Sequence, residues 1–280
     1  NYDWQILNGE AVVASGTFET SAGDPIENGD MSQWCETKEM LPLFGSKKIT
    51  VWYPGSSWRD STPGFWDSSN NAGNKTACTQ DKTKNASCAW LQASGVSLVG
   101  ALASGSLFTG TFTYANMNGT ASFGQKYKYT ARPTALRLKY HATLGTVNYN
   151  KHNGPLEKDK DIMDQCSFTV CIVDWDTRHD VQSGTSAPKG IWDPITMGEL
   201  PVDKQNGIIG YGVKYSSENT PGTDLIPLEI PIKYYQQTNA APDGENKFTI
   251  IISVSTSRYG DYLNGCDKNK IYVDDFEWVY

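Results

Sequence analysis

Two tyrosines, an arginine and an aspartate stand close together near the end of the chain, in the stretch Arg258-Tyr-Gly-Asp-Tyr262. An aromatic ring can pack on the apolar C–H face of a pyranose. A guanidinium or a carboxylate can bond to the sugar hydroxyls. We therefore predict that Arg258, Tyr259, Asp261 and Tyr262 bind a sugar. The alternative is an internal ion pair between Arg258 and Asp261 that fixes the turn.

Four further residues are candidates for the same ligand: Trp66, Asn70, Asn74 and Arg132. Trp66 can stack on a sugar ring, the asparagine amides can bond to hydroxyls, and Arg132 offers a planar fork of donors. Each has a structural alternative. Trp66 can pin the long aperiodic stretch 54–88, the asparagines suit turn backbone, and Arg132 can form an intramolecular ion pair.

Hydrolytic chemistry is not indicated by any particular residues. A glycosidase needs two carboxylates about 5 to 10 Å apart, and with 31 acidic residues no sequence feature selects one pair. His141, His152 and His179 lie far apart, without the spacing of a metal site or a triad. We therefore name no catalytic residue.

Strands must position these side chains. In 247–257 the residues Phe248, Ile250, Ile252 and Val254 alternate with polar ones, which predicts a half-buried strand that leads into the candidate loop. Ile271–Tyr280 predicts the closing strand. Three more strands are expected: a one-sided strand over 132–142 with His141 facing out, a central strand over 166–175, and an edge strand over 225–235, where Pro227 and Pro231 cannot donate to a ladder. A further strand is expected at 11–20, as the first of the chain.

The short strands, long loops and lack of helical periodicity predict an all-β fold, a jelly-roll β-sandwich of two antiparallel sheets. We find no linker or repeat, so residues 1–280 are expected to form a single domain. A linker-derived leading segment over residues 1–14 is the alternative at the N-terminus.

Composition limits the partners. A net charge of −7 and a pI near 5.0 argue against nucleic acid and anionic membrane surfaces, because both require a basic patch. No apolar run has the length of about 20 residues that a transmembrane helix needs. The N-terminus has no signal-peptide pattern, so we expect a mature or trimmed chain.

The six cysteines match no zinc or redox motif. Cys78 and Cys88 flank a polar loop and can bridge in an oxidising compartment. Cys166 and Cys171 lie five positions apart on one strand, and this odd spacing places them on opposite faces. We expect Cys166 to be a small buried hydrophobe.

Five stretches of the chain form a distinctive combination: Trp66-Asp-Ser-Ser-Asn-Asn-Ala-Gly-Asn74, Leu107-Phe-Thr-Gly110, Phe123-Gly-Gln125 leading to Arg132-Pro133, Ser257–Tyr262 and Ile271–Tyr280. Together they resemble the putative carbohydrate metabolism domain of Bacteroidetes surface proteins. The resemblance runs from about Phe18 to Tyr280. It implies a jelly-roll sandwich on an exported lipoprotein, at the cell surface or in the periplasm with its signal peptide removed, and a role in handling glycans. The chain departs from the usual pattern in its six cysteines and in the strand end Ser255-Thr-Ser257.

The first and last strands are also similar to those of calcium-bearing carbohydrate-binding jelly rolls. This similarity implies a structural Ca²⁺ held by Glu19 with Asp274 or Asp275 and backbone carbonyls, because calcium prefers several hard oxygen ligands. Adjacent aspartates point to opposite faces, so only one of them can share a site with Glu19 directly. The alternative is that these carboxylates belong to a solvated strand end and to a turn.

The sequence thus favours non-catalytic binding of a poly- or oligosaccharide by a cell-surface module. A glycoside hydrolase that uses a carboxylate pair is the first alternative. A structural or adhesive module with a protein partner is the second.

Overall fold

Strands and turns dominate the structure, a computed structural model that describes residues 2–18, 24–40, 48–55, 64–72, 77–128, 131–198, 207–235 and 248–280. Helical structure in these ranges is limited to α1 (Pro194–Gly198) and short 3₁₀ turns, which include η1 (Ser69–Ala72), η2 (Ser97–Val99) and η4 (Gly260–Tyr262). Within the same ranges, no helix has the length and apolar character to span a bilayer. The all-β prediction is confirmed.

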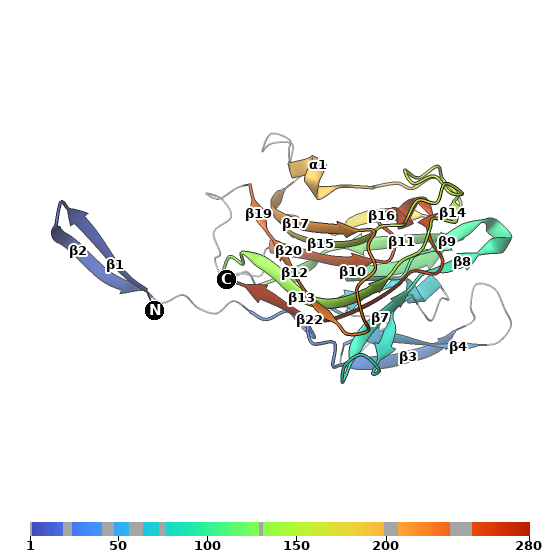
Figure 1. The fold of residues 1–280 in the computed structure, drawn as a ribbon, viewed down its shortest axis with the longest axis horizontal. Helices are drawn as coiled ribbons and strands as arrows, with labels where there is room; N and C mark the ends of the chain where they lie inside the picture. The colour runs from blue at the N-terminus through green and yellow to red at the C-terminus, as the bar shows by residue number, and fades with distance from the viewer. Residues whose placement is uncertain are drawn as a thin grey trace.

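Two large antiparallel sheets form the body of the molecule (Figure 1). The nine-stranded sheet has the order β16 (His179–Ser183), β11 (Asn118–Phe123), β10 (Ser106–Ala115), β20 (Phe248–Ser255), β15 (Cys166–Val173), β17 (Ile208–Ser216) and β19 (Lys233–Tyr234), with β12 (Gln125–Tyr127) paired to β20 and β5 (Trp66–Asp67) paired to β10. The five-stranded sheet has the order β18 (Ile226–Pro231), β13 (Ala135–Thr143), β22 (Lys270–Val279), β7 (Cys88–Gln92) and β6 (Thr79–Asp81).

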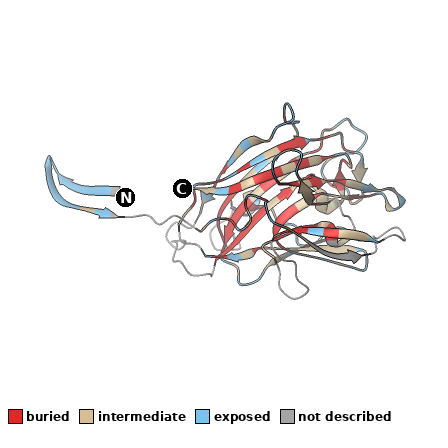
Figure 2. Cartoon of the chain, turned by 90° about the horizontal axis from the view of Figure 1, so that it is seen from below, coloured by how far each residue is buried: buried red, intermediate tan, exposed pale blue. Residues whose placement is uncertain are grey.

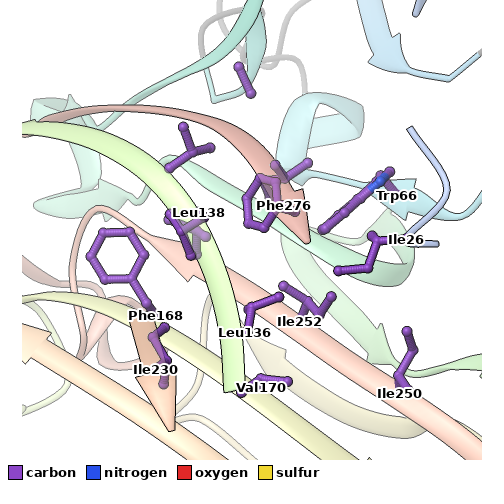
Figure 3. Close-up of a cluster of buried hydrophobic side chains, with 14 of the residues drawn as sticks. Ile26, Trp66, Leu136, Leu138, Phe168, Val170, Ile230, Ile250, Ile252 and Phe276 are labelled. Atoms are coloured by element: carbon purple, nitrogen blue, oxygen red, sulfur yellow. The ribbon is translucent and has the colours of Figure 1, made fainter. Parts of the chain in front are cut away.

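The main core lies between these two sheets. Leu136 and Leu138 of β13 face Phe168 and Val170 of β15 (Figure 3), and all four side chains are buried. Such packing of one sheet on another removes one face of each sheet from water, which is the main stabilising term of a sandwich. The predicted jelly-roll β-sandwich is confirmed.

The strand that leads to the candidate loop differs from its prediction in one respect. Phe248, Ile250, Ile252 and Val254 of β20 lie in the main core as expected. The strand is not half-buried, however, because Ile251 on the opposite face is also buried, in a second cluster with residues that include Cys171 of β15. Loops therefore cover the outer face of the nine-stranded sheet, and this cover could not be deduced from the strand itself.

Other strand predictions agree with the structure in part. The edge strand expected at 225–235 is divided in two: β18 lies at the edge of the five-stranded sheet with Pro227 and Pro231 exposed, and β19 lies at the edge of the nine-stranded sheet. Cys166 is buried in the main core, whereas Cys171 is buried in the second cluster, which confirms their opposite faces. His141 does not face solvent as predicted: it is buried beside the ring of Tyr272, at 6.3 Å between centroids.

Smaller elements border the sandwich. Three two-stranded sheets pair β3 (Trp34–Met40) with β4 (Ile49–Pro54), β8 (Ser94–Val96) with β9 (Ala101–Ala103), and β14 (Tyr149–Asn150) with β21 (Asn264–Gly265). The described cysteines Cys78 and Cys88 form no disulfide, so the bridge considered between them is not present in this structure.

The N-terminal strands form a hairpin that stands away from the sandwich (Figures 1 and 2). β1 (Tyr2–Asn8) pairs with β2 (Ala11–Phe18) in a sheet of its own. The strand expected at 11–20 is therefore present, but its partner is β1 and not a strand of the sandwich. The extent of the predicted single domain over residues 1–280 stays a prediction.

Candidate functional site

A cavity of about 570 Å³ lies on the outer face of the nine-stranded sheet. Strands β10, β11, β15 and β20 line it from below, and residues of the β8–β9 hairpin, of loop 257–263 and of segment 191–194 form its sides. Its volume falls within the range of ligand sites, about 300 to 1,000 Å³. We call it the sheet-face cavity.

Strand alternation explains the lining. Residues of β15 and β20 that do not enter the main core present small polar groups to the cavity, among them Ser167, Thr169, Ser253 and Ser255. Aromatic side chains stand beside them: Phe108, Phe112, Tyr114, Phe123, Trp192, Tyr215, Tyr259 and Tyr262. The cavity thus combines flat apolar faces with hydroxyl groups.

Hydrogen bonds fix several of these hydroxyls. Ser104 Oγ lies 2.9 Å from Ser255 Oγ and 3.1 Å from Thr256 Oγ1. Ser255 Oγ in turn donates to the carbonyl of Ser257 at 2.9 Å. This network links the β9 side of the cavity to the loop that follows β20.

The loop 257–263 is held in place by the buried carboxylate of Asp164. Its Oδ2 accepts hydrogen bonds from Ser257 Oγ at 2.7 Å, Cys266 N at 2.8 Å and Asn269 Nδ2 at 2.6 Å. Burial raises the pKa of Asp164, and the bonds it accepts oppose that rise. Since donors saturate this oxygen, Asp164 anchors the loop and is not available to a ligand.

Arg258 packs between aromatic rings. Its guanidinium carbon lies 3.7 Å from the ring centre of Tyr215 and 5.0 Å from that of Tyr259, and Nη1 donates to Gln165 Oε1 at 3.3 Å. Among the described residues, no ion pair joins Arg258 to Asp261. The internal pair considered from the sequence is therefore absent here, and Arg258 holds two tyrosines of the cavity in position.

Asp261 lies on the cavity wall without a partner. It is partly buried, and no hydrogen bond or ion pair connects it to any described residue. Burial alone raises the pKa of its carboxyl to about 6. The carboxyl of Asp261 therefore lines the cavity without a partner among the described residues, which is the arrangement expected of a group that meets a ligand.

A second carboxylate, Asp193, lines the same cavity just before α1. Its Oδ1 accepts the backbone N–H of Ile195 at 2.9 Å, which orients the side chain. Burial first, and Asp193 second, raise the pKa of the Tyr215 phenol to about 12, while Arg258 lowers it. The cavity therefore contains two carboxylates on separate segments.

The structure brings four of the predicted ligand residues together, because Arg258, Tyr259, Asp261 and Tyr262 all line the sheet-face cavity. Trp66 is placed elsewhere. It is 1% exposed, its ring lies 5.1 Å from that of Phe276, and its Nε1 donates to the carbonyl of Glu27. A sugar cannot reach this indole, so the stacking role expected for Trp66 is corrected to packing.

Asn70 and Arg132 also lie away from the cavity lining. The buried amide of Asn70 donates to the carbonyls of Trp52 and Cys78 and accepts from the N–H of Cys78, which is the turn role weighed against ligand binding. Arg132 stacks at 4.7 Å on the ring of Tyr234. Asn74 lies outside the described residues.

The expected calcium ligands do not converge in the described part of the chain. Asp274 is buried and accepts from Asn85 Nδ2 at 2.6 Å and from the N–H of Asp275. Asp275 instead pairs with Lys139 at 2.8 Å. Glu19 lies outside the described residues, and no group of three potential metal ligands occurs among those described. The ion stays a prediction: a lower Tm after chelation would support it, and an unchanged Tm would remove it.

Sequence reasoning missed most of the site. Trp192 and Asp193 come from a turn-rich stretch without periodicity, and Tyr215 lies on the outer face of β17. One signal was present in β10, where Phe108, Phe112 and Tyr114 share a parity opposite to that of the buried Leu107. A row of aromatic residues on the face opposite the main core indicates that this face is also covered or binds a ligand.

Sequence comparison identifies the domain. A family model described as "Putative carbohydrate metabolism domain" matches residues 18–279. The chain belongs to this family. No curated protein sequence matches it. The recognised resemblance is therefore confirmed over nearly the whole chain, with the hairpin largely outside the matched residues.

Two solved structures have a fold similar to that of this chain. One, described as a putative glycoside hydrolase from Bacteroides thetaiotaomicron VPI-5482, is 16% identical with a TM-score of 0.56, over 94% of this chain and 72% of its own. Another, described in the same words and from Bacteroides vulgatus ATCC 8482, is 15% identical with a TM-score of 0.57, over 88% and 97%. At such identities the likeness concerns the fold alone.

Proposed function

We propose that the protein binds a poly- or oligosaccharide in the sheet-face cavity. The observation that carries this proposal is the composition of one cavity: aromatic faces, fixed hydroxyls and a carboxylate without a partner among the described residues. Pyranose rings offer apolar C–H faces and many hydroxyls, so they complement both kinds of group. Membership of a carbohydrate metabolism family supports the same conclusion.

A neutral sugar fits this cavity better than an acidic one. The guanidinium of Arg258 is engaged with two rings and Gln165, which leaves it little freedom to receive a ligand carboxylate. Asp261 and Asp193 would repel an anion, although Lys151 lines the cavity as well. We therefore propose that the ligand is a neutral glycan. We also propose that the protein is exported and binds this glycan at the cell surface or in the periplasm.

A glycan array that carries neutral and uronic-acid polysaccharides tests the proposal. We expect binding to neutral glycans and little to uronic-acid polymers. Binding to no sugar at all would reject the proposal and would favour the adhesive module with a protein partner.

Trp192→Ala tests whether the sheet-face cavity is the site. Loss of a cavity aromatic is expected to weaken glycan binding about tenfold or more, measured by isothermal titration. Trp4→Ala, which removes an exposed tryptophan of the hairpin, is the matched control and should bind as the parent does. Equal affinity of Trp192→Ala and the parent would place the site elsewhere.

A further inference from the structure

The carboxyl of Asp261 has no protein partner among the described residues. Three carboxylates that are more deeply buried than Asp261 accept hydrogen bonds from the protein: Asp67 from the backbone N–H groups of Ser68 and Phe112, Asp164 from four donors, and Asp274 from Asn85 and Asp275. Those three are structural. Asp261 accepts none from the described residues, so its carboxyl is left for whatever enters the cavity.

Its position is fixed even though its carboxyl is not paired. Asp261 lies in the one-turn helix η4, where Tyr262 N donates to Tyr259 O and Leu263 N donates to Gly260 O. Two further bonds, Lys151 N to Leu263 O and His152 N to Tyr262 O, tie this turn to the segment after β14. A rigidly held backbone that presents an unpaired acid is suited to catalysis.

We propose that the sheet-face cavity hydrolyses a glycosidic bond of the neutral glycan, with Asp261 as the general acid and Asp193 as the base that activates water. This inference rests on the proposed binding function, since it assigns a reaction to the same cavity. It also assigns the two roles that the sequence alone could not, because Asp261 and Asp193 are 68 positions apart and line the same cavity only in the folded chain.

Hydrolysis of the glycosidic bond requires only water besides the two carboxyl groups. The protonated Asp261 gives its proton to the glycosidic oxygen as the bond between that oxygen and the anomeric carbon breaks, and the leaving sugar departs as an alcohol. Water attacks the anomeric carbon, and its proton passes to the Asp193 carboxylate. The products are two sugars, one with a new hemiacetal, and one water is consumed.

The acid must be protonated near the working pH, and burial favours this state because it raises the pKa of Asp261 to about 6. The other charged groups that line the cavity are Lys151, Asp193 and Arg258, with the phenols of Tyr114, Tyr215, Tyr259 and Tyr262. None of them bonds to Asp261. The rate is therefore expected to fall as the pH rises above about 6.

The experiment uses the full chain and the neutral polysaccharides that it binds on the array, with release of reducing ends as the readout. We expect turnover by the parent and a loss of about 100-fold or more in Asp261→Asn and in Asp193→Asn. Glycan affinity of the Asp261→Asn variant should fall far less than the rate, because the asparagine amide can still bond to a sugar hydroxyl. Asp159→Asn, which changes an aspartate that is 79% exposed, is the matched control and should keep full activity.

The outcomes separate the two proposals. Binding without any release by the parent would overturn the hydrolase and leave glycan binding intact. Failure to bind any glycan would overturn both. Release by Asp261→Asn at the parental rate, or a parental rate that does not fall above about pH 6, would overturn the role of Asp261, and a far-UV melt of each variant excludes misfolding as the cause of a loss.

Discussion

At the scale of single residues, burial of Asp261 without a partner destabilises the folded chain at neutral pH. Burial raises the pKa of this carboxyl from its ordinary value of 3.8 to about 6. In this pH interval the folded chain binds more protons at Asp261 than the unfolded chain does. Stability is therefore highest below the unfolded pKa and falls as the pH rises through the folded pKa.

This linkage predicts a pH-dependent difference between the parent and Asp261→Asn. From about pH 4 to pH 6 the free energy of unfolding of the parent should decline relative to the variant, by about 1–3 kcal/mol. Urea denaturation across this interval measures it. Asp159→Asn on the exposed surface should follow the parent, and parallel pH profiles of the parent and Asp261→Asn would show that Asp261 is not desolvated.

At the scale of elements, the loop 257–263 and the β8–β9 hairpin meet at a glycine. A Cβ on Gly260 would lie 2.8 Å from Ser104 Cβ and 3.1 Å from its Oγ, closer than side chains normally approach. The same serine bonds to Ser255 and Thr256 in the lining of the cavity. The absence of a side chain at Gly260 thus permits the two cavity walls to touch.

Gly260→Ala is therefore expected to push the loop away from Ser104. The strain should lower the free energy of unfolding by about 1–3 kcal/mol, and displacement of Tyr259 and Tyr262 should weaken glycan binding more than tenfold. Denaturation and titration measure the two effects. Gly64→Ala is the control, because its Cβ would make an ordinary contact, 3.5 Å from the carbonyl oxygen of Trp66. Parental glycan affinity in Gly260→Ala would mean that this loop does not shape the site.

At the scale of the whole molecule, the sequence predicts what depends on local periodicity. The apolar face of β20, the alternation of β13 and the edge position of β18 follow from a period of two and from proline chemistry. The sheet-face cavity could be predicted only in part, since its sides come from segments far apart in the chain. Trp66 was misassigned because a buried aromatic and a ligand platform look alike within an aperiodic stretch.

The hairpin β1–β2 is the other feature that periodicity alone could not place. Trp4 and Ile6 lie on one face of β1, and Val12 pairs with Leu7 beyond a register shift. The side chains of Trp4, Ile6 and Val12 are 41%, 54% and 50% exposed, in contrast to the buried strands of the sandwich (Figure 2). A two-stranded hairpin has little stability of its own, so this segment should contribute little to the folding of the sandwich.

A pair of matched substitutions tests this independence. Ile6→Ala on the hairpin should change the free energy of unfolding by less than about 0.5 kcal/mol, because the side chain is exposed and buries little apolar area. Leu138→Ala should lower the free energy of unfolding by about 2–5 kcal/mol, since Leu138 is fully buried between the two sheets. Both values come from chemical denaturation of the full chain. A loss in Ile6→Ala close to that in Leu138→Ala would show that the hairpin packs on the sandwich in solution, and residues 1–280 would then unfold as the single unit that the sequence predicts.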